Sequence, residues 1–172
     1  TFFVTDSGLF LVLGGIIDAI VLIIFNIVAS IVLGIVGLSV VTVSGLDVST
    51  NYVASIIVAA VGLVISGVYF VYTWTTQRAT VGMKVLNLQI GSAPSGTTIT
   101  RDQAIRRWIA LGAPFSVAQV LNPLPLIGLL IGLAALGWVI FLLYTTAQSP
   151  TKQGWHDVFA NTMIVKAASP VA

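Results

Sequence analysis

The chain has 172 residues, of which 58% are hydrophobic and only 7% are charged, with a formal net charge of +2 at pH 7. Soluble domains carry about 25% charged residues, so this composition excludes an ordinary water-soluble domain and indicates a membrane protein. With no cysteine and one histidine, the chain excludes disulfides, cysteine nucleophiles and zinc-thiolate sites, and we expect no metal or other cofactor.

Residues 8–41 form a long apolar run, which we expect to be the first membrane helix. Such a helix would measure about 50 Å, whereas the hydrocarbon core of a bilayer is about 30 Å thick. It must tilt, project beyond the lipid or break near Gly34 or Gly37, and we favour one continuous helix with a projecting end. Residues 42–51 predict a short linker rich in turn formers, and residues 52–74 have the length of a second span.

Residues 75–107 are different in character, because they carry five basic residues against a single acid, Asp102. The basic residues are Arg78, Lys84, Arg101, Arg106 and Arg107. Residues 81–90, VGMKVLNLQI, alternate between apolar and polar positions and predict a short strand. Thr100 or Asp102 is expected to cap a helix that begins near Gln103.

Two further membrane segments are expected after this basic stretch. Residues 104–121 predict a third helix, short or re-entrant and interrupted at Gly112 and Pro114. Residues 124–145 predict another span. The tail contains a second possible strand, TMIVKA at 162–167, which is expected to pair with 81–90 as a small β-ribbon.

The basic residues predict the orientation of the chain. The 42–51 linker has no Lys or Arg, whereas the tail adds Lys152 and Lys166 to the basic segment. The positive-inside rule therefore places both termini in the cytoplasm and the linker outside. The expected fold is an all-α membrane protein with one domain over residues 1–172. Its four membrane-embedded helices stand above a small cytoplasmic β-ribbon.

Small residues in the spans are expected to let helices pack closely, because small side chains are enriched at contacts between membrane helices. These predicted packing residues are Gly15, Gly62, Ser66, Gly128 and Gly132.

Asp18 lies inside the first apolar run, where a central aspartate costs about 2.5–3.5 kcal/mol to insert. It should therefore face the bundle and meet a partner. Arg106 and Arg107 are the candidate cationic partners, and Asn26 and Tyr69 are neutral alternatives. Three roles are open: a polar contact that locks helices together, a proton or cation site, or a contact with another subunit.

Three stretches together resemble the RDD family of small bacterial membrane proteins, named for one arginine and two aspartates. They are IIDAIVLI at 16–23, TTQRATVGMKVLNLQI at 75–90 followed by an arginine-bearing helix, and SPTKQGWHDVFANTMIVK at 149–166. The residues that match the family pattern are Asp18, Gly82, Lys84, Gln153, Gly154, His156, Asp157, Thr162 and Val165. Two positions differ: no arginine occurs in the nine residues before Asp18, and Asn161 stands where glycine is usual.

The resemblance implies a multi-pass protein of the bacterial cytoplasmic (inner) membrane, with transport as a suggested activity. Gly82 and Gly154 are expected to supply turns. Asp157, in the place of the family's second aspartate, is expected to cap a turn or to bind Arg78, Arg101 or Lys152.

The leading functional hypothesis is a non-enzymatic accessory or assembly subunit that packs against other membrane proteins. The alternative is a transporter of a small solute or ion, coupled to protons or cations, that uses Asp18. An enzyme is disfavoured because no nucleophile, base and orienting partner occur together. The expected partners are the lipid bilayer, other membrane subunits and anionic lipid headgroups, and nothing indicates nucleic acid.

Overall fold

The computed structural model describes residues 8–121 and 125–167, which are mostly helical. The four long helices are α1 (Gly8–Ile35), α2 (Tyr52–Thr76), α4 (Arg101–Leu121) and α5 (Pro125–Gln148). The short helices are α3 (Val81–Val85) and α6 (Trp155–Ala160). The strands are β1 (Val41–Ser44), β2 (Asp47–Thr50), β3 (Leu88–Ser92) and β4 (Thr162–Lys166).

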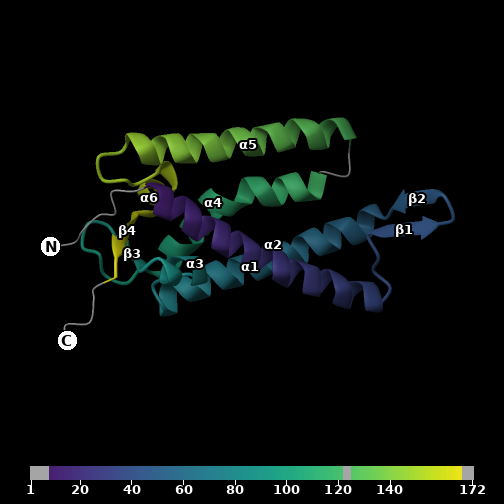
Figure 1. Cartoon of the computed structure of the whole chain (residues 1–172), viewed down its shortest axis with the longest axis horizontal. Coiled ribbons are helices and arrows are strands. Elements are labelled where there is room, and N and C mark those ends of the chain that lie inside the picture. Colours follow the sequence, from purple (N-terminus) through teal and green to yellow (C-terminus); the bar gives the residue numbers. More distant parts are fainter. Residues whose placement is uncertain (1–7, 122–124, 168–172) are drawn as a thin grey trace.

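The long helices run lengthwise along the molecule, and consecutive ones run in opposite directions (Figure 1). Helix α2 contacts α1 and α4, and α4 also contacts α5. One end of the molecule, which we call the basic end, holds α3, β3, β4, α6 and the start of α4 (Figure 1). All seven Lys and Arg residues of the sequence lie in or beside these elements. The β1–β2 hairpin lies at the opposite end (Figure 1), so the charge segregation seen in the sequence is also present in space.

Three helical segments in the described part of the chain are long and apolar enough to cross a membrane. They are Val12–Ile35, Tyr52–Thr76 and Leu126–Gln148. Helix α4 is not among them, because its first two turns carry Arg101, Asp102, Arg106 and Arg107. It nevertheless runs beside its neighbours from the basic end toward the hairpin end (Figure 1). The fold is thus mostly helical with three candidate spans, and the membrane crossing of α4 stays a prediction.

The first helix is shorter than we favoured. Helix α1 ends at Ile35, and Gly37 adopts a φ of +90°, a left-handed conformation that ends helices. The expectation of a continuous helix to Val41 was wrong, and the break near Gly37 was the better alternative. The linker is a hairpin in which Ser44 pairs with Asp47. Gly45, with φ +65°, occupies the first turn position, where a type II′ turn requires glycine.

The predicted strand at 81–90 was placed too early. Residues 81–85 are helical, because the Thr80 side chain caps α3 by accepting a hydrogen bond from the Met83 N–H at 3.2 Å. Asn87 then turns the chain with a φ of +53° before β3 begins. Strand β3 pairs antiparallel with β4, from Leu88 opposite Lys166 to Ser92 opposite Thr162. The expected ribbon therefore exists, with its first strand shifted toward the C-terminus.

Helix α4 is capped as expected but is not interrupted. Thr100 accepts a hydrogen bond from the Gln103 N–H at 3.2 Å, and the Gln103 side chain accepts one from the Thr100 N–H at 2.9 Å. This reciprocal pair is a capping box. The predicted interruption at Gly112 and Pro114 was wrong, because α4 continues through Pro114 to Leu121.

The hydrophobic core lies at the basic end rather than between the spans. Its buried members are Trp74, Ala79, Met83, Leu88, Ile90, Ile99, Ala104 and Ile164. The spans instead leave large apolar side chains exposed, as at Ile23 and Ile31 in α1. Surfaces of this kind are stable against lipid and unstable against water, so the basic end is the packed body that positions the buried polar groups.

Candidate functional site

Asp18 is buried between α1, α2 and α3, where its carboxylate accepts three hydrogen bonds. The Tyr69 hydroxyl donates to Oδ1 at 2.7 Å, and the Gly82 N–H donates to the same oxygen at 2.9 Å. The Thr80 hydroxyl donates to Oδ2 at 2.5 Å. The Asp18 residue is only 6% exposed. Three donors satisfy much of the hydrogen-bonding capacity that a carboxylate loses on leaving water, and none of them carries a charge.

Two glycines bring the backbone donor within reach of Asp18. A Cβ atom at Gly82 would overlap the Gly14 carbonyl oxygen and would lie 3.1 Å from the Asp18 Cγ. The absence of a side chain at Gly82 therefore lets α3 rest directly on α1. Gly82 was expected to supply a turn, but its structural role is this close approach.

The expectation that Arg106 or Arg107 meets Asp18 was wrong, and the neutral alternative Tyr69 is the partner. Arg106 pairs instead with Asp102, one turn earlier on α4, at 2.9 Å on the exposed surface. The Asn26 side chain donates to the Leu22 carbonyl at 2.8 Å. The predicted intramembrane polar site is therefore divided among separate contacts, because Arg106 pairs within α4 and Arg107 pairs with Asp157 of α6.

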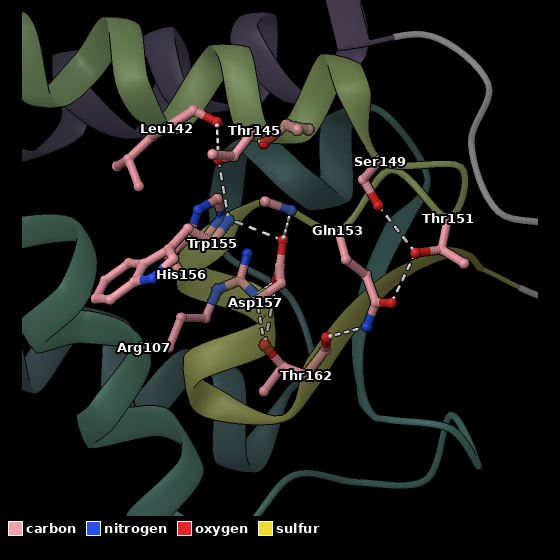
Figure 2. Close-up of polar contacts among 12 residues, drawn as sticks. Arg107, Leu142, Thr145, Ser149, Thr151, Gln153, Trp155, His156, Asp157 and Thr162 are labelled. Atoms are coloured by element: carbon pink, nitrogen blue, oxygen red, sulfur yellow. Dashed lines mark hydrogen bonds and ion pairs between the residues drawn. The ribbon is translucent and has the colours of Figure 1, made fainter.

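Asp157 is the centre of a second buried cluster, which joins α4, α6 and β4 (Figure 2). The Arg107 Nη1 donates to Asp157 Oδ1 and also to the Thr162 hydroxyl oxygen, the latter at 2.7 Å. The Thr162 hydroxyl donates to Asp157 Oδ1 at 3.2 Å. The side chains of Arg107 and Asp157 are 6% and 2% exposed. This is a buried ion pair whose charges are further satisfied by a hydroxyl group.

The second oxygen of Asp157 holds the start of α6. The Gly154 N–H donates to Oδ2 at 3.2 Å, and the His156 Nε2 lies 3.2 Å from the same oxygen. Asp157 therefore caps a turn, as expected. Its cationic partner is Arg107, so the predicted pairing with Arg78, Arg101 or Lys152 was wrong.

The neighbours of Asp157 include most of the closing sequence motif. The Gln153 side chain donates to the Thr162 carbonyl at 2.8 Å. Any side chain at Gly154 would collide with Thr146 and His156. Asn161 ends α6 in the left-handed conformation, with φ +54°. Asparagine tolerates this conformation better than most residues, so it can stand where the family usually has glycine.

Burial lowers the pKa of His156 from its usual 6.5 to about 3, and the positive charge of Arg107 acts in the same direction. The imidazole is therefore neutral at neutral pH. A neutral imidazole can bond to a carboxylate through Nε2 only if Nε2 carries the proton. His156 therefore lies beside Asp157 as a neutral group, with Nε2 3.2 Å from Oδ2.

The remaining predicted residues lie apart from both clusters. Lys84 is exposed, and its amine donates to the Gln77 side chain. Gly62 faces the Asn26 side chain at the contact of α1 and α2. The Ser66 hydroxyl accepts a hydrogen bond from the Trp108 Nε1–H at 3.2 Å, which joins α2 to α4.

The three other predicted packing glycines differ from one another. Gly128 is buried. At Gly15 and Gly132, in contrast, a Cβ atom would meet no described atom within 4 Å. These two positions therefore lie on faces that the described part of this chain leaves uncovered.

Sequence reasoning missed three residues of the clusters or their surroundings. Thr80 was not singled out, although a threonine just before an apolar stretch is a typical helix cap. Trp74 lies under Arg107, with its ring centroid 5.3 Å from the Arg107 Cζ, and only the fold brings the two together. Trp155 belongs to an aromatic group described below. Across residues 8–121 and 125–167, no group of three or more His, Cys, Asp or Glu side chains could hold a metal ion.

The fold and the two clusters define a class: a multi-pass helical membrane protein whose two buried aspartates fasten a small α/β body to the ends of its apolar helices. Comparison with known families is more specific. The sequence model of the RDD family matches residues 9–161, and the chain belongs to this family. Searches of curated proteins and of solved structures returned no significant match.

The burial of the Arg107–Asp157 pair predicts that breaking it lowers the free energy of unfolding far more than breaking an exposed ion pair does. Arg107→Met or Asp157→Asn leaves one charge buried without its partner and should lower the free energy of unfolding by about 3–5 kcal/mol. The matched controls Arg106→Met and Asp102→Asn break an exposed pair and should change it by about 0–1 kcal/mol. Unfolding by denaturing detergent in mixed micelles measures the free energy of unfolding of each variant and each control. Similar small losses for all four variants would contradict the assignment.

The lowered pKa of His156 predicts that the folded protein loses stability in mild acid. The unfolded chain binds a proton near pH 6.5, whereas the folded chain binds it only near pH 3. The stability due to the neutral imidazole is therefore present above pH 6.5 and is lost as the pH falls below it, by up to about 1.4 kcal/mol per pH unit. The unfolding temperature of the wild type should fall between pH 7 and pH 5, and that of His156→Gln should fall less. Parallel pH profiles would show that His156 is not the responsible group.

Proposed function

We propose that this RDD-family membrane protein is a non-enzymatic accessory or assembly subunit that packs against other membrane proteins. In this proposal it resides in the bacterial cytoplasmic membrane, with its basic end and both termini facing the cytoplasm. The observation that carries the proposal is that the two deeply buried aspartates of the described residues are each held by several contacts within the chain. Asp18 is held by Tyr69, Thr80 and Gly82, and Asp157 is held by Arg107.

The surface of the spans supports an assembly role. At Gly15 of α1 and at Gly132 and Gly137 of α5, a Cβ atom would meet nothing described within 4 Å. Uncovered glycines in apolar helices allow another helix backbone to approach closely, which is how membrane helices gain packing energy in the absence of a hydrophobic driving force.

Helix α2 adds a shallow apolar groove to this surface. It is lined by Ile57, Ala60, Val61, Val64 and Ile65. A groove lined by four branched side chains and one alanine suits the ridges of a neighbouring helix. We therefore place the contacts with other membrane subunits on the faces of α1, α2 and α5 that residues 8–121 and 125–167 leave uncovered.

The basic end suits the surface of an anionic membrane. Lys84, Arg101, Arg106 and Lys166 are exposed there. A basic side chain near such a surface contributes about 1 kcal/mol of attraction. These residues would help to fix the orientation of the chain, because anionic headgroups are abundant on the cytoplasmic leaflet.

Transport through Asp18 is the competing proposal, and it is motivated by the fact that Asp18 is the sole acid in the three apolar spans. The geometry makes it the weaker one. A carried cation would have to displace the Tyr69 hydroxyl, the Thr80 hydroxyl or the Gly82 N–H from the carboxylate. Each lost hydrogen bond leaves a buried donor without an acceptor, which costs about 1–3 kcal/mol.

The accessory proposal predicts that the native protein migrates in a complex. Tagged chain solubilised from native membranes in mild detergent should run well above the size of one chain, with membrane proteins copurifying. Gly15→Leu and Gly132→Leu fill the uncovered positions and should shift the chain toward its single size. Ile20→Leu, a volume-conserving change at an exposed α1 position, is the matched control and should leave the complex intact.

A native chain that runs alone, with no copurifying protein, would overturn the accessory proposal. Unfolding temperatures measured on each purified variant separate a lost contact from a lost fold, because the two leucine substitutions enter open space.

A further inference from the structure

Helix α6 has two faces of opposite character. Its residues Trp155, Val158 and Phe159 are 39%, 66% and 48% exposed. Asp157 and Ala160, on the other face, are each 1% exposed. An exposed face made of two aromatic rings and a valine is unfavourable in water, where burying such side chains gains about 1.5–3 kcal/mol each. Something other than water is therefore expected to cover it.

The exposed rings of α6 continue an aromatic group on α5. The Trp155 ring stacks on Phe159 with centroids 5.2 Å apart. Trp155 also contacts Trp138 and Phe141 of α5, with ring centroids 5.3 Å and 6.2 Å apart. Trp138 and Phe141 both belong to the apolar segment Leu126–Gln148. The apolar surface of a membrane-spanning helix and that of α6 are thus one continuous surface.

The depth of α6 follows from the same contacts. The backbone N–H of Trp155 donates to the Thr145 hydroxyl oxygen at 3.1 Å, so α6 folds back beside the last turns of α5 (Figure 2). At 1.5 Å per residue, Phe141 and Trp138 lie about 10 Å and about 15 Å along the helix from the end of α5 at Gln148. The exposed face of α6 therefore lies level with the last turns of a span, not beyond its end.

The buried face holds α6 in this position. Asp157 binds Arg107 of α4 and also caps α6 through the Gly154 N–H. Thr162, just after α6, accepts a second hydrogen bond from Arg107 at 2.7 Å. With its polar side fixed to α4 and β4, α6 can present only its aromatic side outward.

We propose that α6 is an interfacial anchor, with Trp155, Val158 and Phe159 in the boundary between headgroups and acyl chains. The occupant of this face is lipid, because the face continues the apolar surface of a span, and because tryptophan is enriched at membrane interfaces. The Arg107–Asp157 pair then has a second consequence: it sets the orientation of a membrane-binding surface. This inference needs only that the spans are in a bilayer, so it stands or falls independently of the accessory role.

Single-cysteine spin labels test the anchor directly, because the chain has no cysteine of its own. Labels at Val158→Cys and Phe159→Cys, in full-length protein reconstituted into phosphatidylethanolamine and phosphatidylglycerol vesicles, should be more accessible to oxygen than to a water-soluble nickel complex. Ile140→Cys, exposed on α5, is the lipid control, and Thr98→Cys, exposed in the loop before α4, is the water control.

The expected result is that labels at 158 and 159 resemble the label at 140 in their preference for oxygen. Preference for the nickel complex, as at 98, would overturn the inference in favour of water. Low accessibility to both reagents would overturn it in favour of a protein contact.

A second measurement avoids the labels. Wild-type protein and Trp155→Phe are compared in vesicles whose lipids carry bromine either near the headgroup end or near the terminal end of the acyl chains. The fluorescence due to Trp155, taken as the difference, should be quenched several-fold more strongly by the shallow bromines. Equal lack of quenching by both lipids would contradict the proposed depth.

Discussion

The structure depends on one constraint: a charge that leaves water in this chain must find a partner within it. An isolated buried carboxylate is so costly that it either gains donors or loses its charge. Asp18 gains three neutral donors from α2 and the α3 region, and Asp157 gains Arg107, Thr162 and the start of α6. Each aspartate thereby joins segments that are distant in sequence, and together the two clusters fasten the basic end to the long helices.

This arrangement explains why the packed core and the apolar surface are in different places. Trp74 of α2, Ile90 of β3 and Ile164 of β4 are buried together in the core at the basic end. The spans beyond them are exposed along most of their length. Lipid or other membrane proteins must complete these surfaces. In our proposal the chain is therefore a rigid cytoplasmic body that presents membrane helices and an interfacial helix to its surroundings.

Local patterns in the sequence predicted the elements whose formation is itself local. The lengths of the apolar runs gave the three spans, Thr100 and Gln103 gave the start of α4, and the tail gave β4. The partners of the buried charges could not be read in this way, since Asp18 meets Thr80 at a separation of 62 residues. Arg107 was one of the candidate partners of Asp18, whereas the packing of α6 on α4 pairs it with Asp157. The role of Gly82 could not be predicted from the sequence either, because it depends on a backbone contact with Gly14.

The central claim, that Asp18 is a structural lock and not a carrier, is tested most directly by ion flux. Wild-type protein and Asp18→Asn are reconstituted into vesicles containing a pH-sensitive dye, and proton flux is followed after a pH jump, with and without added sodium or potassium. The account predicts the same flux for both proteins, equal to the leak of protein-free vesicles. Wild-type flux well above that leak, abolished by Asp18→Asn in a variant that unfolds at the wild-type temperature, would contradict it.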